Sequence, residues 1–278
     1  MVSQNHELMG FDNRPIGVFD SGIGGITVLR ELVREFPHEN FIYLGDTARL
    51  PYGSKSAATV RNYSVQNMKF LVSQDVKAIV VACNTASTQI FENEFEGRPV
   101  YNVIDPGSLL AAQKTENKKV GVLATRATIK AGSYTKKIKA HDDSIEIFSQ
   151  ACPLFVPLAE EGWNEDPITN LIAFRYLQNL KAADVDTVVL GCTHYPLLKS
   201  AIARVFGNHV KLVDSGEAVA VLLHQDFASQ KIMGNAPSND AILKIALTDK
   251  SEHFEALSAQ LLASVSAISI QFETVSVI

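Results

Sequence analysis

Short apolar runs alternate with helix-length segments along this chain, and that alternation restricts its fold more than any other feature. In the first part the runs are 16–19, 41–44, 78–82 and 100–103, with helix-like segments at 25–36, 56–73 and 85–95. The runs are nearly continuous in apolar residues, which is typical of parallel strands buried on both faces. Because helices separate the strands, the sequence predicts an α/β fold with mainly parallel sheets.

The pattern then restarts, with expected strands at 120–124, 145–148, 187–190 and 210–213 and helices near 129–140, 168–180 and 196–206. The segment 16–21 resembles 120–125, and Cys83 and Cys192 follow similar strands. We therefore predict two pseudo-symmetric α/β domains with the active site in the cleft between them. The first comprises 1–105 plus 216–278 and the second 106–215. The helices expected near 216–227 and 253–263 return to the first domain.

Composition excludes several classes of protein. The 278 residues include 46% hydrophobic and 20% charged residues, and the net charge of −5 does not favour nucleic acid or an anionic membrane surface. The sequence shows no secretory signal and no apolar run of about 20 residues that would span a bilayer. Three cysteines are too few for a disulfide framework, so we expect a cytoplasmic protein with reduced thiols. A homodimer is compatible with this reading.

The first cysteine motif, Ala82-Cys83-Asn84-Thr85, runs from a strand into a helix. Asn84 or Thr85 is suited to cap that helix. A thiol at a helix N-terminus lies at the positive end of the helix dipole, which lowers its pKa. The alternative is a small buried cysteine that simply closes the strand.

The second cysteine motif, Cys192-Thr193-His194-Tyr195-Pro196, has the same design. Pro196 fits the first turn of a helix. His194 lies two residues after Cys192, so both side chains can face one cleft. A histidine beside a cysteine can polarise the thiol or carry its proton, although a lone histidine is more often structural.

Two further polar segments follow strands of the first half. Asp20 ends the first strand and precedes a glycine-rich turn, which lacks the dinucleotide fingerprint because Thr27 occupies the position of its third glycine. Its carboxylate could hold an ammonium group or orient a base. The segment 45–53 belongs to the same rim of the sheet, with a plain surface loop as the alternative.

Cys152 is interpreted as structural, and Glu160 and Glu161 as a solvated pair in a loop.

Together these motifs resemble the glutamate racemase family, within the wider aspartate/glutamate racemase group. The matching stretches are Gly17-Val18-Phe19-Asp20-Ser21-Gly22-Ile23-Gly24-Gly25, Gly45-Asp46-Thr47-Ala48-Arg49, Pro51-Tyr52-Gly53, Ala82-Cys83-Asn84-Thr85-Ala86-Ser87, Gly121-Val122-Leu123-Ala124-Thr125, Gly191-Cys192-Thr193-His194-Tyr195-Pro196 and Val213-Asp214-Ser215-Gly216-Glu217. The two cysteine motifs, in this order and context, are highly specific.

The resemblance implies that glutamate is the substrate, that Cys83 and Cys192 donate and accept its α-proton, and that no cofactor or metal takes part. It implies that Asp20 and His194 assist the thiols, with Glu160 as a further carboxylate. The implied substrate contacts are Asp20, Ser21, Pro51, Tyr52, Gly53, Asn84, Thr85, Thr125, Thr193 and His194. The D-glutamate formed would supply peptidoglycan synthesis.

Racemisation removes a proton from one face of Cα and returns one to the other, so two opposed thiols suit it. No lysine motif for pyridoxal phosphate is recognisable, so the site itself must stabilise the carbanionic transition state. The resemblance assigns Cys83 to the D-face and Cys192 to the L-face. The alternatives are a related racemase or isomerase acting on aspartate, a hydantoin or maleate, a binding protein for a small acid, or a thiol redox protein.

Overall fold

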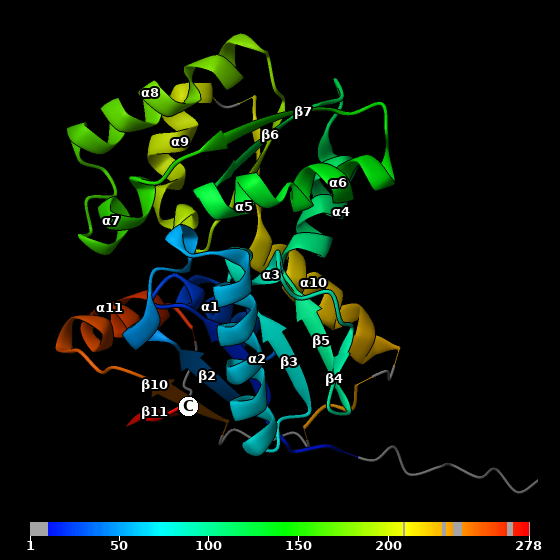
Figure 1. The fold of residues 1–278 in the computed structure, drawn as a ribbon, viewed down its shortest axis with the longest axis vertical. Coiled ribbons are helices and arrows are strands. Elements are labelled where there is room, and N and C mark those ends of the chain that lie inside the picture. The colour runs from blue at the N-terminus through cyan, green and yellow to red at the C-terminus, as the bar shows by residue number, and fades with distance from the viewer. Residues whose placement is uncertain (1–10, 208, 230–231, 236–240, 266–268, 278) are drawn as a thin grey trace, which may run out of the picture.

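The computed structural model describes residues 11–207, 209–229, 232–235, 241–265 and 269–277. Within these residues the strands form a seven-stranded sheet and a four-stranded sheet, which lie in the lower and upper lobes of Figure 1. The larger sheet has the order β11-β10-β2-β1-β3-β5-β4. Its strands are β1 (Ile16–Asp20), β2 (Phe41–Gly45), β3 (Ala78–Val81), β4 (Glu94–Phe95), β5 (Arg98–Asn102), β10 (Ile242–Leu247) and β11 (Ser269–Thr274).

The smaller sheet has the order β7-β6-β8-β9, and all of its described pairs are parallel. Its strands are β6 (Lys119–Ala124), β7 (Glu146–Ala151), β8 (Thr187–Gly191) and β9 (Lys211–Asp214). In the larger sheet only β4 pairs in an antiparallel way, with β5. The predicted α/β class with mainly parallel sheets is therefore confirmed.

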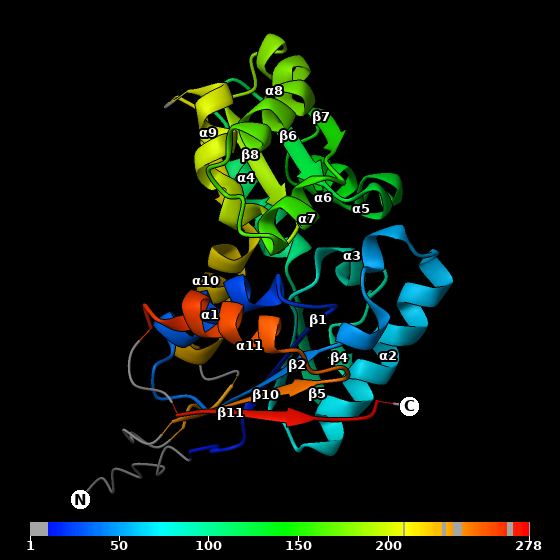
Figure 2. The same ribbon diagram turned by 90° about the vertical axis from the view of Figure 1, so that its left-hand side faces the viewer.

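Helices cover the sheets and connect their strands (Figures 1 and 2). The described helices are α1 (Gly25–Glu35), α2 (Ala57–Ser73), α3 (Asn84–Ser87), α4 (Ile104–Lys114), α5 (Arg126–Ala131), α6 (Ser133–His141), α7 (Phe155–Glu160), α8 (Pro167–Ala182), α9 (Lys199–Phe206), α10 (Ser215–Ala228) and α11 (Glu252–Leu262), with the 3₁₀ segments η1 (Thr47–Arg49), η2 (Tyr52–Ser54) and η3 (Tyr195–Leu198). No helix among the described residues is long and apolar enough to cross a membrane.

The internal repeat extends to the pairing of the strands. The order β2-β1-β3-β5 in one sheet matches β7-β6-β8-β9 in the other. Ile16 pairs with Ala78 in the first sheet, and Val120 pairs with Thr187 in the second. In the internal repeat, Val120 corresponds to Ile16 and Thr187 corresponds to Ala78. The two sheets therefore pair these strands in the same register. Strands β3 and β8 therefore end within one residue of equivalent places, and each delivers its cysteine to the edge that faces the other sheet.

Equivalent glycines let a helix and the following turn pack closely on each central strand. A side chain at Gly17 in β1 would collide with Val76, which precedes β3, and would crowd Leu71 in the last turn of α2. A side chain at Gly121 in β6 would collide with Leu180 and also crowd Val188. The tight packing of helix on sheet thus repeats along with the strand register, which explains a glycine at both positions.

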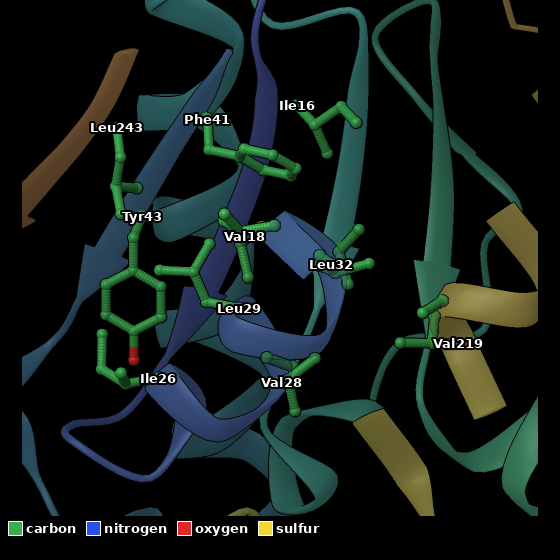
Figure 3. Packing of buried hydrophobic residues seen from close by; sticks show 14 of the residues in the cluster. Ile16, Val18, Ile26, Val28, Leu29, Leu32, Phe41, Tyr43, Val219 and Leu243 are labelled. Atoms are coloured by element: carbon green, nitrogen blue, oxygen red, sulfur yellow. The ribbon is translucent and has the colours of Figure 1, made fainter. Parts of the chain in front are cut away.

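The core of the lower lobe forms where α1 packs on the sheet (Figure 3). Ile16 and Tyr43 from the strands and Leu29 and Leu32 from α1 are fully buried in it. Val219 of α10 joins this cluster, as does Leu262 of α11. The C-terminal helices therefore return to the first sheet, as the sequence predicted. The domain boundaries at 105/106 and 215/216 stay a prediction.

Several local expectations were wrong. The helix expected at 85–95 is only α3, because Glu96 and Gly97 adopt positive φ and turn the chain into a β4–β5 hairpin. The helix near 129–140 is divided at Gly132, whose left-handed conformation ends α5. The helix expected at 196–206 starts as η3 and becomes α9 at Lys199. Strands β10 and β11 and helices α4 and α7 were not anticipated.

Candidate active site

A cavity of about 540 Å³ lies at the edge where the two sheets face each other, and both cysteines line it. Eleven of the sequence-predicted site residues contribute to its wall: Ser21, Pro51, Tyr52, Gly53, Cys83, Asn84, Thr85, Thr125, Cys192, Thr193 and His194. Two predicted residues, Asp20 and Glu160, lie behind the wall. They contact the site through Thr193 and His194.

Cys83 is the last residue before α3 and caps that helix itself. Its Sγ accepts a hydrogen bond from the Ala86 backbone N–H at 3.4 Å, so the expected capping by Asn84 or Thr85 was wrong. The expected fall in its pKa is also contradicted. Burial raises the pKa of Cys83 well above its ordinary value, and the nearby Asp20 carboxylate raises it further. The N–H groups at the helix start act in the opposite direction but are outweighed, so Cys83 holds its proton as a thiol.

Cys192 lies at the end of β8 beside an imidazole. Its Sγ is 3.8 Å from His194 Nδ1, and His194 Nε2 is 3.0 Å from Glu160 Oε1. Glu160 is the last residue of α7, so the expectation of a solvated loop pair was wrong for it. Burial by itself would lower the pKa of His194, but the hydrogen bonds to Cys192 and Glu160 raise it from 6.5 to about 10. His194 is therefore an imidazolium near neutral pH.

Asp20 is fully buried beneath the cavity and does not line it. Its carboxylate accepts hydrogen bonds from the Gly22 N–H at 2.9 Å and from Thr193 Oγ1 at 3.3 Å. Burial raises the pKa of Asp20, while the charge of His194 lowers it. The Asp20 carboxylate thus bonds to Gly22 in its own half and to Thr193 in the other half. It positions the Thr193–His194 turn from beneath the cavity.

Buried Asp46 and Tyr52 anchor the segment 45–53, which is otherwise partly exposed, as in the surface-loop alternative. Asp46 is fully buried and accepts hydrogen bonds from Arg49 Nε at 2.8 Å, from Thr248 Oγ1 at 3.1 Å and from the Tyr52 hydroxyl. Asn67 Nδ2 donates to the same Tyr52 hydroxyl at 3.0 Å. Tyr52 and the residues that follow it are therefore held against the cavity by a polar network in the first half.

Hydroxyl groups join the two halves at the cavity wall. Thr85 Oγ1 lies 3.0 Å from Thr125 Oγ1 and 3.2 Å from Thr128 Oγ1. Thr125 caps α5 by accepting a hydrogen bond from the Thr128 N–H. A Cβ at Gly53 would lie 3.0 Å from Thr125 Cβ, so the chain passes close to α5 here.

Sequence reasoning missed the basic side chains of this cavity. Lys55, Arg126 and Lys130 line it, and within the described residues no Asp or Glu side chain does. Arg126 directly follows the strand-end residue Thr125, and Lys130 lies one helical turn further along, on the same face of α5. Two basic residues one helical turn apart, directly after a predicted strand end, were the sequence signal that could have placed these side chains at the cavity. A cavity with this lining favours an anionic ligand.

The described residues contain no group of three or more His, Cys, Asp or Glu side chains placed to hold a metal ion. Cys152, interpreted as structural, is fully buried in the core of the second half and does not line the cavity. Its Sγ contacts the Gln150 carbonyl at 3.6 Å.

The raised pKa of His194 predicts a pH-dependent contribution to stability. Because the folded state holds the proton more tightly, this contribution is complete below about pH 6.5, declines as the pH rises, and is lost above about pH 10. We expect the difference in the free energy of unfolding between the wild type and His194→Gln to shrink over that range. Urea unfolding at pH 6, 8 and 10 measures it. A difference that does not vary with pH would contradict the imidazolium assignment.

Comparison with known proteins gives a consistent result. The family model described as Asp/Glu/Hydantoin racemase matches residues 16–223. A glutamate racemase from Geobacter metallireducens is 51% identical over 209 residues, which cover 74% of this chain and 77% of that protein. One from Chlorobaculum tepidum is 42% identical over 246 residues, which cover 87% and 90%.

The structural comparison covers more of the chain. A glutamate racemase from Francisella tularensis, solved in complex with D-glutamate, superimposes with a TM-score of 0.87 and 38% sequence identity. The match covers 95% of this chain and 98% of that one. It includes both halves, and with them both walls of the cavity.

Proposed function

Since this chain belongs to the glutamate racemases, within the Asp/Glu/hydantoin racemase family, we propose that it interconverts L- and D-glutamate by moving the α-proton between Cys83 and Cys192. One observation carries the proposal: two cysteines from equivalent strand ends of two facing halves line one cavity. A symmetric arrangement suits a reaction whose two directions are mirror images. The proposed mechanism uses no cofactor and no metal.

The two cysteines have different surroundings. Cys83 is a thiol, because burial and the nearby Asp20 carboxylate oppose its ionisation. Cys192 Sγ lies instead 3.8 Å from Nδ1 of the His194 imidazolium, a group that can carry its proton. Cys83 is thus ready to donate a proton. With Cys192 on the L-face and Cys83 on the D-face, Cys83 would give that proton to the D-face when L-glutamate is converted.

Hydrogen-bond donors at the strand ends would stabilise the negative charge that develops on the substrate carboxylate. The backbone N–H groups at the start of α3 and the hydroxyls of Ser21 and Thr85 lie at the cavity. Such donors are most effective where water is excluded. Cys83 and Cys192 are only 5% and 6% exposed, so the reacting groups are already largely shielded.

The charge of the cavity supports an acidic amino acid as the substrate. Glutamate carries a net negative charge near neutral pH, and Lys55, Arg126 and Lys130 line the cavity. A cationic lining raises the local concentration of such a substrate and speeds its entry. The D-glutamate bound by the Francisella protein agrees with this assignment. In the cell, the proposed role is supply of D-glutamate for peptidoglycan, with the enzyme located in the cytoplasm.

The test is to incubate the purified protein with L-glutamate in D₂O without added cofactor, and to follow the Cα–H signal and the optical rotation. We expect the Cα–H signal to disappear and the rotation to decay to zero. Exchange with aspartate but not with glutamate would keep the family and change the substrate. No exchange with any acidic amino acid, by folded protein, would favour a binding protein instead.

A further inference from the structure

Four buried groups from four elements form a hydrogen-bonded network beside the cavity. Asn84 Nδ2 donates to the Tyr134 hydroxyl at 2.8 Å and to Ser215 Oγ at 3.2 Å. The Tyr134 hydroxyl lies 3.1 Å from Ser215 Oγ, which donates to the Leu190 carbonyl at 3.1 Å. Helices α3, α6 and α10 and strand β8 therefore meet at this point.

The direction of each hydrogen bond follows from the Leu190 carbonyl. A carbonyl oxygen only accepts, so the single hydroxyl hydrogen of Ser215 is directed to Leu190. Tyr134 must then donate to Ser215, and burial raises the pKa of Tyr134, so its hydroxyl keeps that proton. The oxygens of both hydroxyls remain as acceptors for the two amide hydrogens of Asn84. Each of the four hydrogen bonds in the network thus has its own donor hydrogen.

The opposite orientation of the Asn84 amide is disfavoured. It would place Oδ1 against both hydroxyls, although Ser215 has no further hydrogen to donate. The NH₂ group would then lack these two acceptors in a buried position, which is costly. Solvent cannot readily compensate, because Asn84 and Tyr134 are each only 2% exposed and Ser215 only 3%.

The network leaves one atom of Asn84 available. Asn84 lines the cavity and directly follows Cys83, and its buried Oδ1 has no hydrogen-bond partner among the described residues. We infer that Tyr134 and Ser215 are positioning residues, which turn the Asn84 amide so that Oδ1 is kept for the α-ammonium group of the substrate. This inference rests on the proposed function and assigns a role to two residues outside the cavity wall.

A double-mutant cycle tests the inference. Tyr134→Phe removes only the hydroxyl and keeps the ring that packs in the core. We expect it to lower kcat/KM for glutamate about tenfold, since a hydrogen bond to a charged group loses its fixed partner. In an Asn84→Ala background the same substitution should have little further effect, because Tyr134 acts through Asn84. Ser215→Ala, measured in the same cycle, should behave in the same way.

The matched control is Tyr101→Phe, which removes a buried tyrosine hydroxyl that donates to Asp226 outside this cavity. Its kcat/KM should equal that of the wild type. Equal losses from Tyr134→Phe in both backgrounds would overturn the inference, because the hydroxyl would then only support the fold. So would an unchanged kcat/KM in Tyr134→Phe and Ser215→Ala, with the proposed function intact. Wild-type protein that racemises no acidic amino acid would instead refute the proposed function.

Discussion

Replacing Cys83 or Cys192 by serine is expected to reduce racemisation of glutamate by about 10³-fold, within the range for loss of a general acid or base. Each variant lacks the proton donor or acceptor on one face of Cα, and a serine hydroxyl is too weak an acid to replace a thiol. The remaining thiol can still remove and return a proton on its own face. In D₂O we therefore expect Cys83→Ser to exchange the α-proton of L-glutamate without inversion, and Cys192→Ser that of D-glutamate.

The third cysteine provides the control for this experiment. Cys152→Ala removes a buried thiol that does not line the cavity, so the folded variant should keep the turnover of the wild type. Proton NMR in D₂O gives the exchange, and optical rotation gives the inversion. A Cys83→Ser variant with full turnover in both directions is incompatible with the two-thiol mechanism. Exchange on the opposite enantiomers would reverse the assignment of faces.

Gly24→Ala is expected to lower kcat/KM by about 10²-fold while the chain still folds. Gly24 has helical backbone angles, so alanine causes no backbone strain there. Its Cβ, however, would overlap with Thr193 Oγ1 and His194 Nδ1 from the other half. The Thr193–His194 turn must then move away, which separates the imidazolium from Cys192. A displacement of about 1 Å at a catalytic group is enough for such a loss.

Gly107→Ala is the matched control, because it is also a helical glycine. A Cβ there would lie 3.6 Å from the Tyr134 ring and hydroxyl and 3.7 Å from Ser215 Oγ, which are ordinary contacts that displace neither hydroxyl. We expect unchanged activity and a slight gain in stability, since alanine favours helix. Thermal unfolding and kcat/KM for both variants distinguish the two effects. Wild-type kcat/KM in Gly24→Ala would show that the turn tolerates displacement and is not tightly positioned.

Much of the fold could be predicted because its strands are buried on both faces. That burial requires nearly continuous apolar runs, which are visible in the sequence, and the repeated motifs reveal that both halves share one plan. The failures were local. The segment 85–95 has helix-like length, but the turn at Glu96 and Gly97 directs it into a hairpin. The strands β10 and β11 were missed, although β10 is largely buried.

For the site, the sequence by itself determined which residues stand at the strand ends. Cys83, Cys192 and Asp20 follow apolar runs, and the polarity of a parallel sheet then places them at one edge. Only the tertiary structure decided the pKa shifts of Cys83 and Asp20 and which residues support the site. The hydrogen bonds between His194 and Glu160 and between Asn84 and Tyr134 join residues that are far apart in the chain. Such contacts, and the burial that raises the pKa of Cys83, depend on how the two halves pack together, and no local pattern of residues records that packing.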